Sequence, residues 1–130
     1  GYEDVKKEIE NSEFKNDIIV TGWVGDDLPQ LLNQAKSLVF PSVYEGFGLP
    51  VLEAMACGCP VVCSKLFSLE EVGGEGNTYI DPSNIDQIVM AVEKLLNNGD
   101  YRQKQVGYGL ERVKQFDWGK TADKVWELLK

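Results

Sequence analysis

The sequence predicts an α/β fold in which a parallel β-sheet carries helices on both faces. Short apolar runs rich in β-branched residues, typical of buried strands, alternate with longer segments whose apolar residues recur every three or four positions, typical of helices. Right-handed crossovers between parallel strands place helices on both faces and gather the strand-end loops at one edge of the sheet. A ligand site is therefore expected at that edge.

Each predicted element in the first two thirds of the chain follows from its local pattern. The strands are apolar runs bounded by glycine, proline or polar residues, and Pro29 and Pro50 stand in first turns of helices, where a missing N–H costs nothing. The predicted order is a helix over residues 4–10, a strand over 18–20, a helix over 28–35, a strand over 38–40, a helix over 50–57, a strand over 61–63, a short helix over 69–72 and a strand over 78–80.

The last third of the chain is predicted to be entirely helical. Asn84 is a plausible N-cap for a helix over residues 85–96, whose apolar positions form one stripe and which stops at Gly99. Two further helices are expected over residues 100–115 and 120–129. No internal repeat or linker interrupts the pattern.

The composition describes one soluble globular domain. Of 130 residues, 43% are hydrophobic and 26% are charged, which suffices for a packed core. The 21 acidic residues outnumber the 13 basic ones, so the net charge of −8 argues against sequence-independent binding of nucleic acid. The sequence contains no long apolar run and no leader pattern, so a cytoplasmic location is expected.

Three cysteines lie close together in the sequence, at Cys57, Cys59 and Cys63. No histidine is present, and the spacing lacks the two cysteine pairs that mark structural metal sites. We therefore expect reduced thiols packed around the strand over residues 61–63, and no metal site.

The most informative segment begins at Glu45. Gly46 and Gly48 flank Phe47 directly after a predicted strand and allow the backbone to approach a ligand closely. Pro50 then opens a helix, and the unpaired N–H groups of a helix N-terminus favour a phosphate or diphosphate. Two carboxylates, Glu45 and Glu53, lie beside this anion site, and they need neutral donors such as sugar hydroxyls. The segment predicts a nucleotide-sugar site.

At these residues the chain resembles the retaining GT-B glycosyltransferases of family 4, whose signature reads E-G-F-G-L-P-x-x-E-A-M-A-x-G-x-P-V-V. The signature matches residues 45–62, and the resemblance continues in Glu71-Val72-Gly73-Gly74, Asp81-Pro82 and Phe116-Asp117-Trp118. It implies that residues 1–130 are a partial C-terminal, Rossmann-like half that binds the donor. Glu70 departs from the proline common at this position in the family.

The resemblance also implies roles for individual residues in a retaining, metal-free transfer from a UDP- or GDP-sugar. Glu45, the catalytic candidate, holds a hydroxyl of the donor sugar, and the amides of Gly46, Phe47 and Gly48 hold others. The amides of Leu49 and Val51 face the phosphates, whereas Glu53 binds the ribose. Trp23 either stacks on the base or packs inside the protein, and the Val24 backbone contacts the base.

The family's missing parts bear on the expected partners. Nothing in this chain matches the family's first strand, its glycine-rich loop, its arginine and lysine clamp or its preceding acceptor-binding half. We therefore expect an N-terminally truncated domain that is inactive alone, whose parent associates peripherally with a membrane. Because the last family helix crosses to the other half, Trp118 and Trp126 are expected in an exposed apolar patch.

Two other functional classes remain to be weighed against the glycosyltransferase. A non-catalytic nucleotide- or sugar-phosphate-binding module would keep the fold. The sequence disfavours this class, because both glutamates and the glycine pair are intact. A Rossmann-type cofactor protein would need a G-x-G-x-x-G segment between a strand and a helix, and the sequence contains none.

Overall fold

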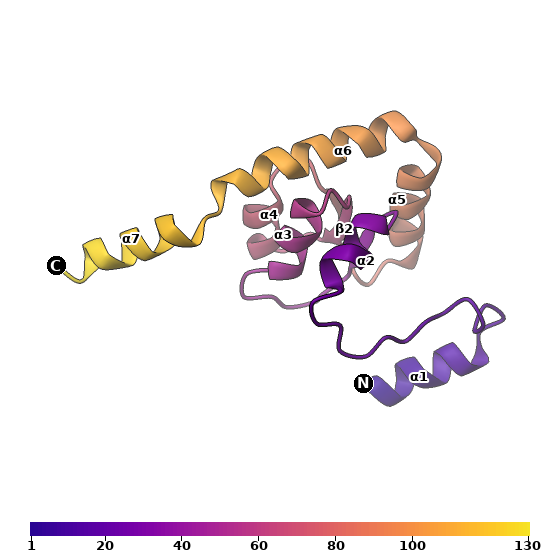
Figure 1. Cartoon of the computed structure of the whole chain (residues 1–130). Helices are drawn as coiled ribbons and strands as arrows, with labels where there is room; N and C mark the ends of the chain where they lie inside the picture. Colours follow the sequence, from indigo (N-terminus) through magenta and orange to yellow (C-terminus); the bar gives the residue numbers. More distant parts are fainter.

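The computed structural model describes residues 1–130 and confirms the α/β fold (Figure 1). Three parallel strands form one sheet in the order β1-β2-β3. In chain order the elements are α1 (Tyr2–Asn11), α2 (Leu28–Gln34), β1 (Leu38–Phe40), α3 (Leu49–Ala56), β2 (Val61–Ser64), α4 (Phe67–Gly73), β3 (Thr78–Ile80), α5 (Ile85–Asn97), α6 (Gly99–Arg112), the 3₁₀ turn η1 (Val113–Gln115) and α7 (Trp118–Leu128).

The central strand β2 separates two hydrophobic cores. All four of its residues are buried, and successive side chains point to opposite faces of a strand. Val61 and Cys63 belong to the core that contains residues of α2, α3 and α4, whereas Val62 packs with Ile80 and Leu95 on the face covered by α5. The long helix α6 contacts both α3 and α5 (Figure 1). The prediction of helices on both faces is confirmed.

The predicted strand over residues 18–20 is wrong. These residues make no ladder with any strand, and Ile19 and Val20 are 84% and 60% exposed. They run beside α1 instead and line a hollow with Val5 and Ile9. A β-branched run supplies the side chains of a strand, but a strand forms only where a neighbouring backbone pairs with it.

Polar caps set three of the helix starts in the second half. The side chain of Asn84 accepts the Gln87 N–H at 3.0 Å, as predicted, and Asn98 caps α6 in the same way. Asp117 accepts the Lys120 N–H at 2.9 Å. Because Asp117 is the cap, α7 begins at Trp118 rather than at residue 120, and α6 gives way to a 3₁₀ turn before it.

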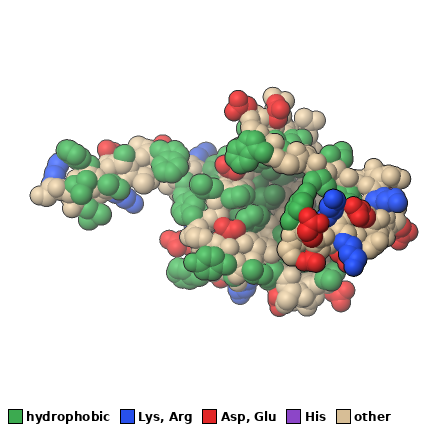
Figure 2. All heavy atoms as spheres, turned by 90° about the horizontal axis from the view of Figure 1, so that it is seen from below, with side chains coloured by type: hydrophobic (Ala, Val, Ile, Leu, Met, Phe, Trp, Pro, Cys, Tyr) green, Lys and Arg blue, Asp and Glu red, His purple; other side chains and the backbone are tan.

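Helices α1 and α7 bury no residue, and α7 extends away from the rest of the molecule (Figure 1). Trp118 and Trp126 are 80% and 63% exposed, which confirms the predicted apolar patch. Figure 2 shows hydrophobic side chains gathered along this protruding segment. No helix of the chain combines the length and the hydrophobicity that crossing a bilayer requires.

Candidate functional site

The segment that we call the glycine loop, residues 45–48, leads from the C-terminal side of β1 into α3. Gly48 is the N-cap of α3 and adopts a left-handed conformation, with φ 97° and ψ 44°. A Cβ built on Gly48 would lie 2.4 Å from Cδ2 of the buried Leu69. Both the backbone conformation and the contact with α4 therefore require glycine at this position.

The backbone N–H groups of four consecutive residues, Gly46, Phe47, Gly48 and Leu49, donate to no acceptor in the protein. The amide of Val51 was expected to face the phosphates, but it donates to the Gly48 carbonyl at 3.0 Å. The first turn of α3 closes on its own cap there, and Val51 itself is fully buried. The free donors are thus one continuous run at the start of α3, where the helix dipole adds a partial positive charge.

The two glutamates of the segment stand on either side of these amides. Glu45 is half-buried in the loop, and Glu53 is exposed on α3. Neither carboxylate forms an ion pair or accepts a hydrogen bond within the protein. The site therefore combines a run of unpaired donors with two unpaired acceptors, which suits a ligand that carries both an anion and hydroxyl groups.

Comparison with known proteins places the chain in a family. The family model described as "Glycosyl transferases group 1" matches residues 1–112. The chain belongs to the group 1 glycosyltransferases. It is 47% identical over 98 residues to an O-antigen chain mannosyltransferase B of Escherichia coli, a match covering 75% of this chain. It is 38% identical over 109 residues, 83% of this chain, to a serotype-specific mannosyltransferase of the same species.

Solved structures agree on the fold of this glycosyltransferase domain. A sucrose-phosphate synthase from Thermosynechococcus elongatus superposes with a TM-score of 0.86 at 25% identity, covering 96% of this chain and 32% of that one. TarM superposes with a TM-score of 0.82 at 22% identity and covers 98% of this chain and 26% of its own. The predicted C-terminal GT-B glycosyltransferase domain is confirmed. The chain spans only 26% and 13% of the two E. coli relatives.

In this group 1 glycosyltransferase, the predicted base contacts lie along a separate hollow. Trp23 and Val24 line an open hollow of about 450 Å³ with residues of α2; the other lining residues are Thr21, Gly25, Asp27, Gln30, Leu31 and Gln34. Trp23 is 94% exposed, so its indole does not pack inside the protein. Packing of Trp23 inside the protein is therefore excluded, and stacking on the base stays a prediction.

Two residues at the site were not predicted from the sequence. The Ser68 hydroxyl donates to the Glu45 carbonyl at 3.0 Å, and the ring of Phe116 meets that of Phe47 edge to face, with centroids 6.1 Å apart. Ser68 carries no sequence signal, because its partner lies 23 residues away. Phe116 belongs to a segment that matches the family, and this match is the signal that could have singled it out.

The three cysteines are free thiols, and two of them are buried. Burial raises the pKa of the Cys63 thiol from 9.0 to about 12, against a smaller lowering by the Asn77 side chain. Burial also raises the pKa of Cys59 and of Tyr79. A thiolate forms only at strongly alkaline pH in such surroundings, so Cys63 belongs to the core rather than to a reactive site.

We expect the free energy of unfolding to fall between about pH 9 and 12, partly through Cys63. The unfolded thiol ionises near its ordinary pKa of 9.0, while the folded one stays protonated. The unfolded state therefore binds fewer protons, and its free energy falls relative to that of the folded state as the pH rises. Each such group contributes at most about 1.4 kcal/mol per pH unit. Urea unfolding across this range should show a shallower decline for Cys63→Ala, and an unchanged slope would contradict the assignment.

Proposed function

We propose that this domain binds a nucleotide-diphospho-sugar and serves a retaining transfer of mannose to a growing glycan. The observation that supports it best is the run of unpaired amides from Gly46 to Leu49, at a helix N-terminus and between two unpaired carboxylates. The mannose assignment rests on the two E. coli relatives, both described as mannosyltransferases. UDP- and GDP-mannose are the donors to consider.

The proposed chemistry uses the amides for charge and the carboxylates for orientation. Negative charge builds on the departing diphosphate during transfer, and fixed N–H groups with the dipole of α3 stabilise it without a metal ion. In the proposal, Glu45 accepts hydrogen bonds from sugar hydroxyls and Glu53 from the ribose. The acceptor attacks from the face that the diphosphate leaves, which retains the anomeric configuration. In this proposal the acceptor is bound by parts of the protein other than residues 1–130.

Calorimetric titration with UDP, GDP, ADP and their mannose conjugates tests this proposal. We expect one nucleotide and its sugar conjugate to bind. Glu53→Ala should weaken both ligands about tenfold or more, because a charged hydrogen-bond acceptor is lost, whereas Glu45→Ala should weaken only the conjugate. Glu93→Ala removes an exposed glutamate from α5 and serves as the control.

Two results would count against these roles. Equal loss of affinity from both glutamate substitutions would contradict the separation into sugar and ribose sites. Binding of a nucleotide that neither substitution weakens would remove the glutamates from the site altogether. If none of these ligands binds, the proposal that this domain binds a nucleotide-sugar donor fails, whereas binding of a free nucleotide without its sugar conjugate would favour the non-catalytic module.

A further inference from the structure

The glycine loop has few bonds of its own, and its conformation depends on contacts from distant parts of the chain. Its only backbone hydrogen bond is the one between the Gly48 carbonyl and Val51. We propose that Ser68 and Phe116 are positioning residues that hold the glycine loop in the form that binds the donor sugar. This inference rests on the proposed function and concerns the same site.

Ser68 fixes the direction of the Gly46 amide in the loop. Its hydroxyl donates to the Glu45 carbonyl from the first turn of α4. The peptide that joins Glu45 to Gly46 is trans, so its C=O and N–H point in opposite directions. A carbonyl held towards α4 therefore turns the Gly46 N–H away from α4. The same bond restricts the backbone that carries the Glu45 carboxylate.

The neighbouring residue of α4 supports the other end of the loop. Leu69 is fully buried, and its side chain fills the space where a Cβ of Gly48 would lie. Adjacent residues of one helix thus contact the first and the last residue of the glycine loop. The two contacts together set the distance between Glu45 and the start of α3.

Phe116 holds the middle of the loop. Its ring meets Phe47 at an interplanar angle of 83°, the edge-to-face arrangement that aromatic pairs prefer. Phe47 is 47% exposed, so this contact covers one side of its ring and leaves the rest open. The guanidinium carbon of Arg112 lies over the Phe116 ring, 5.3 Å from its centroid. Phe116 thus contacts both the loop, at Phe47, and the last residue of α6, Arg112.

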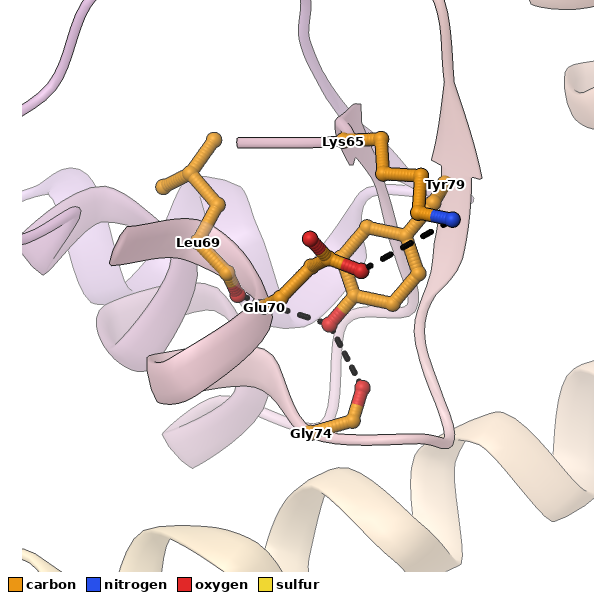
Figure 3. Close-up of polar contacts among 5 residues, drawn as sticks. All are labelled: Lys65, Leu69, Glu70, Gly74 and Tyr79. Atoms are coloured by element: carbon orange, nitrogen blue, oxygen red, sulfur yellow. Dashed lines mark hydrogen bonds and ion pairs between the residues drawn. The ribbon is translucent and has the colours of Figure 1, made fainter. Parts of the chain in front are cut away.

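The helix that carries Ser68 is itself held at several points. Arg112 donates from Nε to the Val72 carbonyl at 3.1 Å and from Nη2 to the Glu71 carbonyl. The Tyr79 hydroxyl of β3 donates to the Gly74 carbonyl, with the Leu69 carbonyl 3.4 Å away (Figure 3). One residue, Arg112, therefore secures both α4 and Phe116. The residues that contact the glycine loop, Ser68, Leu69 and Phe116, are thus linked to one another through Arg112 and α4.

Paired substitutions at Ser68 test the proposal by separating sugar from nucleotide. We expect Ser68→Ala to weaken binding of the nucleotide sugar about threefold to tenfold, the worth of one hydrogen bond, with binding of the nucleoside diphosphate changed less than about twofold. Ser68→Thr keeps the hydroxyl and should restore the affinity. Ser83→Ala removes a hydroxyl that bonds to Asp81 at the start of α5 and is the control. Phe116→Leu should act in the same direction as Ser68→Ala.

Backbone ¹⁵N relaxation of the same variants supplies a reading that needs no ligand. We expect greater mobility of the Gly46, Phe47 and Gly48 amides in Ser68→Ala and not in Ser68→Thr. If the unaltered chain binds no nucleotide sugar, the proposed function fails, and relaxation alone then decides whether Ser68 holds the loop. Unchanged relaxation in Ser68→Ala, or equal weakening of both ligands, would overturn the inference.

Discussion

Gly48→Ala is expected to lower the free energy of unfolding by about 2–4 kcal/mol and to abolish measurable donor binding. An alanine would have to adopt a φ of 97°, which L-residues with a Cβ rarely adopt. Its Cβ would also lie 2.4 Å from a methyl group of Leu69, a side chain with no exposed surface into which to move. Urea unfolding measures the first effect and calorimetric titration the second.

Gly46→Ala is the matched control for this substitution. A Cβ at Gly46 would meet no atom within 4 Å, and its φ lies outside the left-handed region. The control should keep its stability within about 0.5 kcal/mol of the unaltered chain. If Gly48→Ala were as stable as Gly46→Ala, the requirement for glycine at the N-cap of α3 would be wrong.

The second large effect is expected in the other core. Leu95→Ala should lower the free energy of unfolding by about 2–5 kcal/mol, because a fully buried side chain is lost from the face where Val62, Ile80 and Ala91 meet. The glycine loop is supported from α4, whose residues belong to the opposite core. The dissociation constant for the donor should therefore stay within about twofold of the unaltered chain under conditions where the variant is folded.

Leu96→Ala provides the comparison for Leu95→Ala on the same helix. Leu96 is 54% exposed, and its loss should cost less than about 1 kcal/mol. A drop in donor affinity in Leu95→Ala without loss of folded protein would contradict the separation of the two cores. It would mean instead that the sheet transmits strain from one face to the other.

The three strands of the sheet could be predicted, because each is a short apolar run whose side chains fit a doubly covered sheet. β2 is the clearest case, since all four of its residues are buried. The run at Ile18 has the same composition and yet forms no strand. Composition identifies segments that are able to form strands. Whether such a segment becomes a strand depends on whether the fold places another strand beside it for hydrogen bonding.

The candidate site divides in a similar way. Neighbouring residues predicted the glycine loop, the two flanking glutamates and a helix start at Pro50, one residue after the observed start at Leu49. The hydrogen bond from the Val51 amide to the Gly48 carbonyl was not predicted. A sequence locates a helix N-terminus only to within a residue or two, so it does not show which of the first amides are paired. Ser68 was missed because a single serine carries no pattern, and its role arises only when α4 packs beside the loop.

The sequence by itself determined what short-range interactions set: the alternation of strands and helices, the cap at Asn84, and a glycine loop that ends at a helix N-terminus. Only the tertiary structure decided what depends on residues far apart in the chain. It determined which run joins the sheet, which amides stay free, and that Ser68 and Phe116 meet the glycine loop. The reason is physical, because conformational preferences act between neighbours along the chain, whereas pairing and packing act between whatever surfaces the fold brings together.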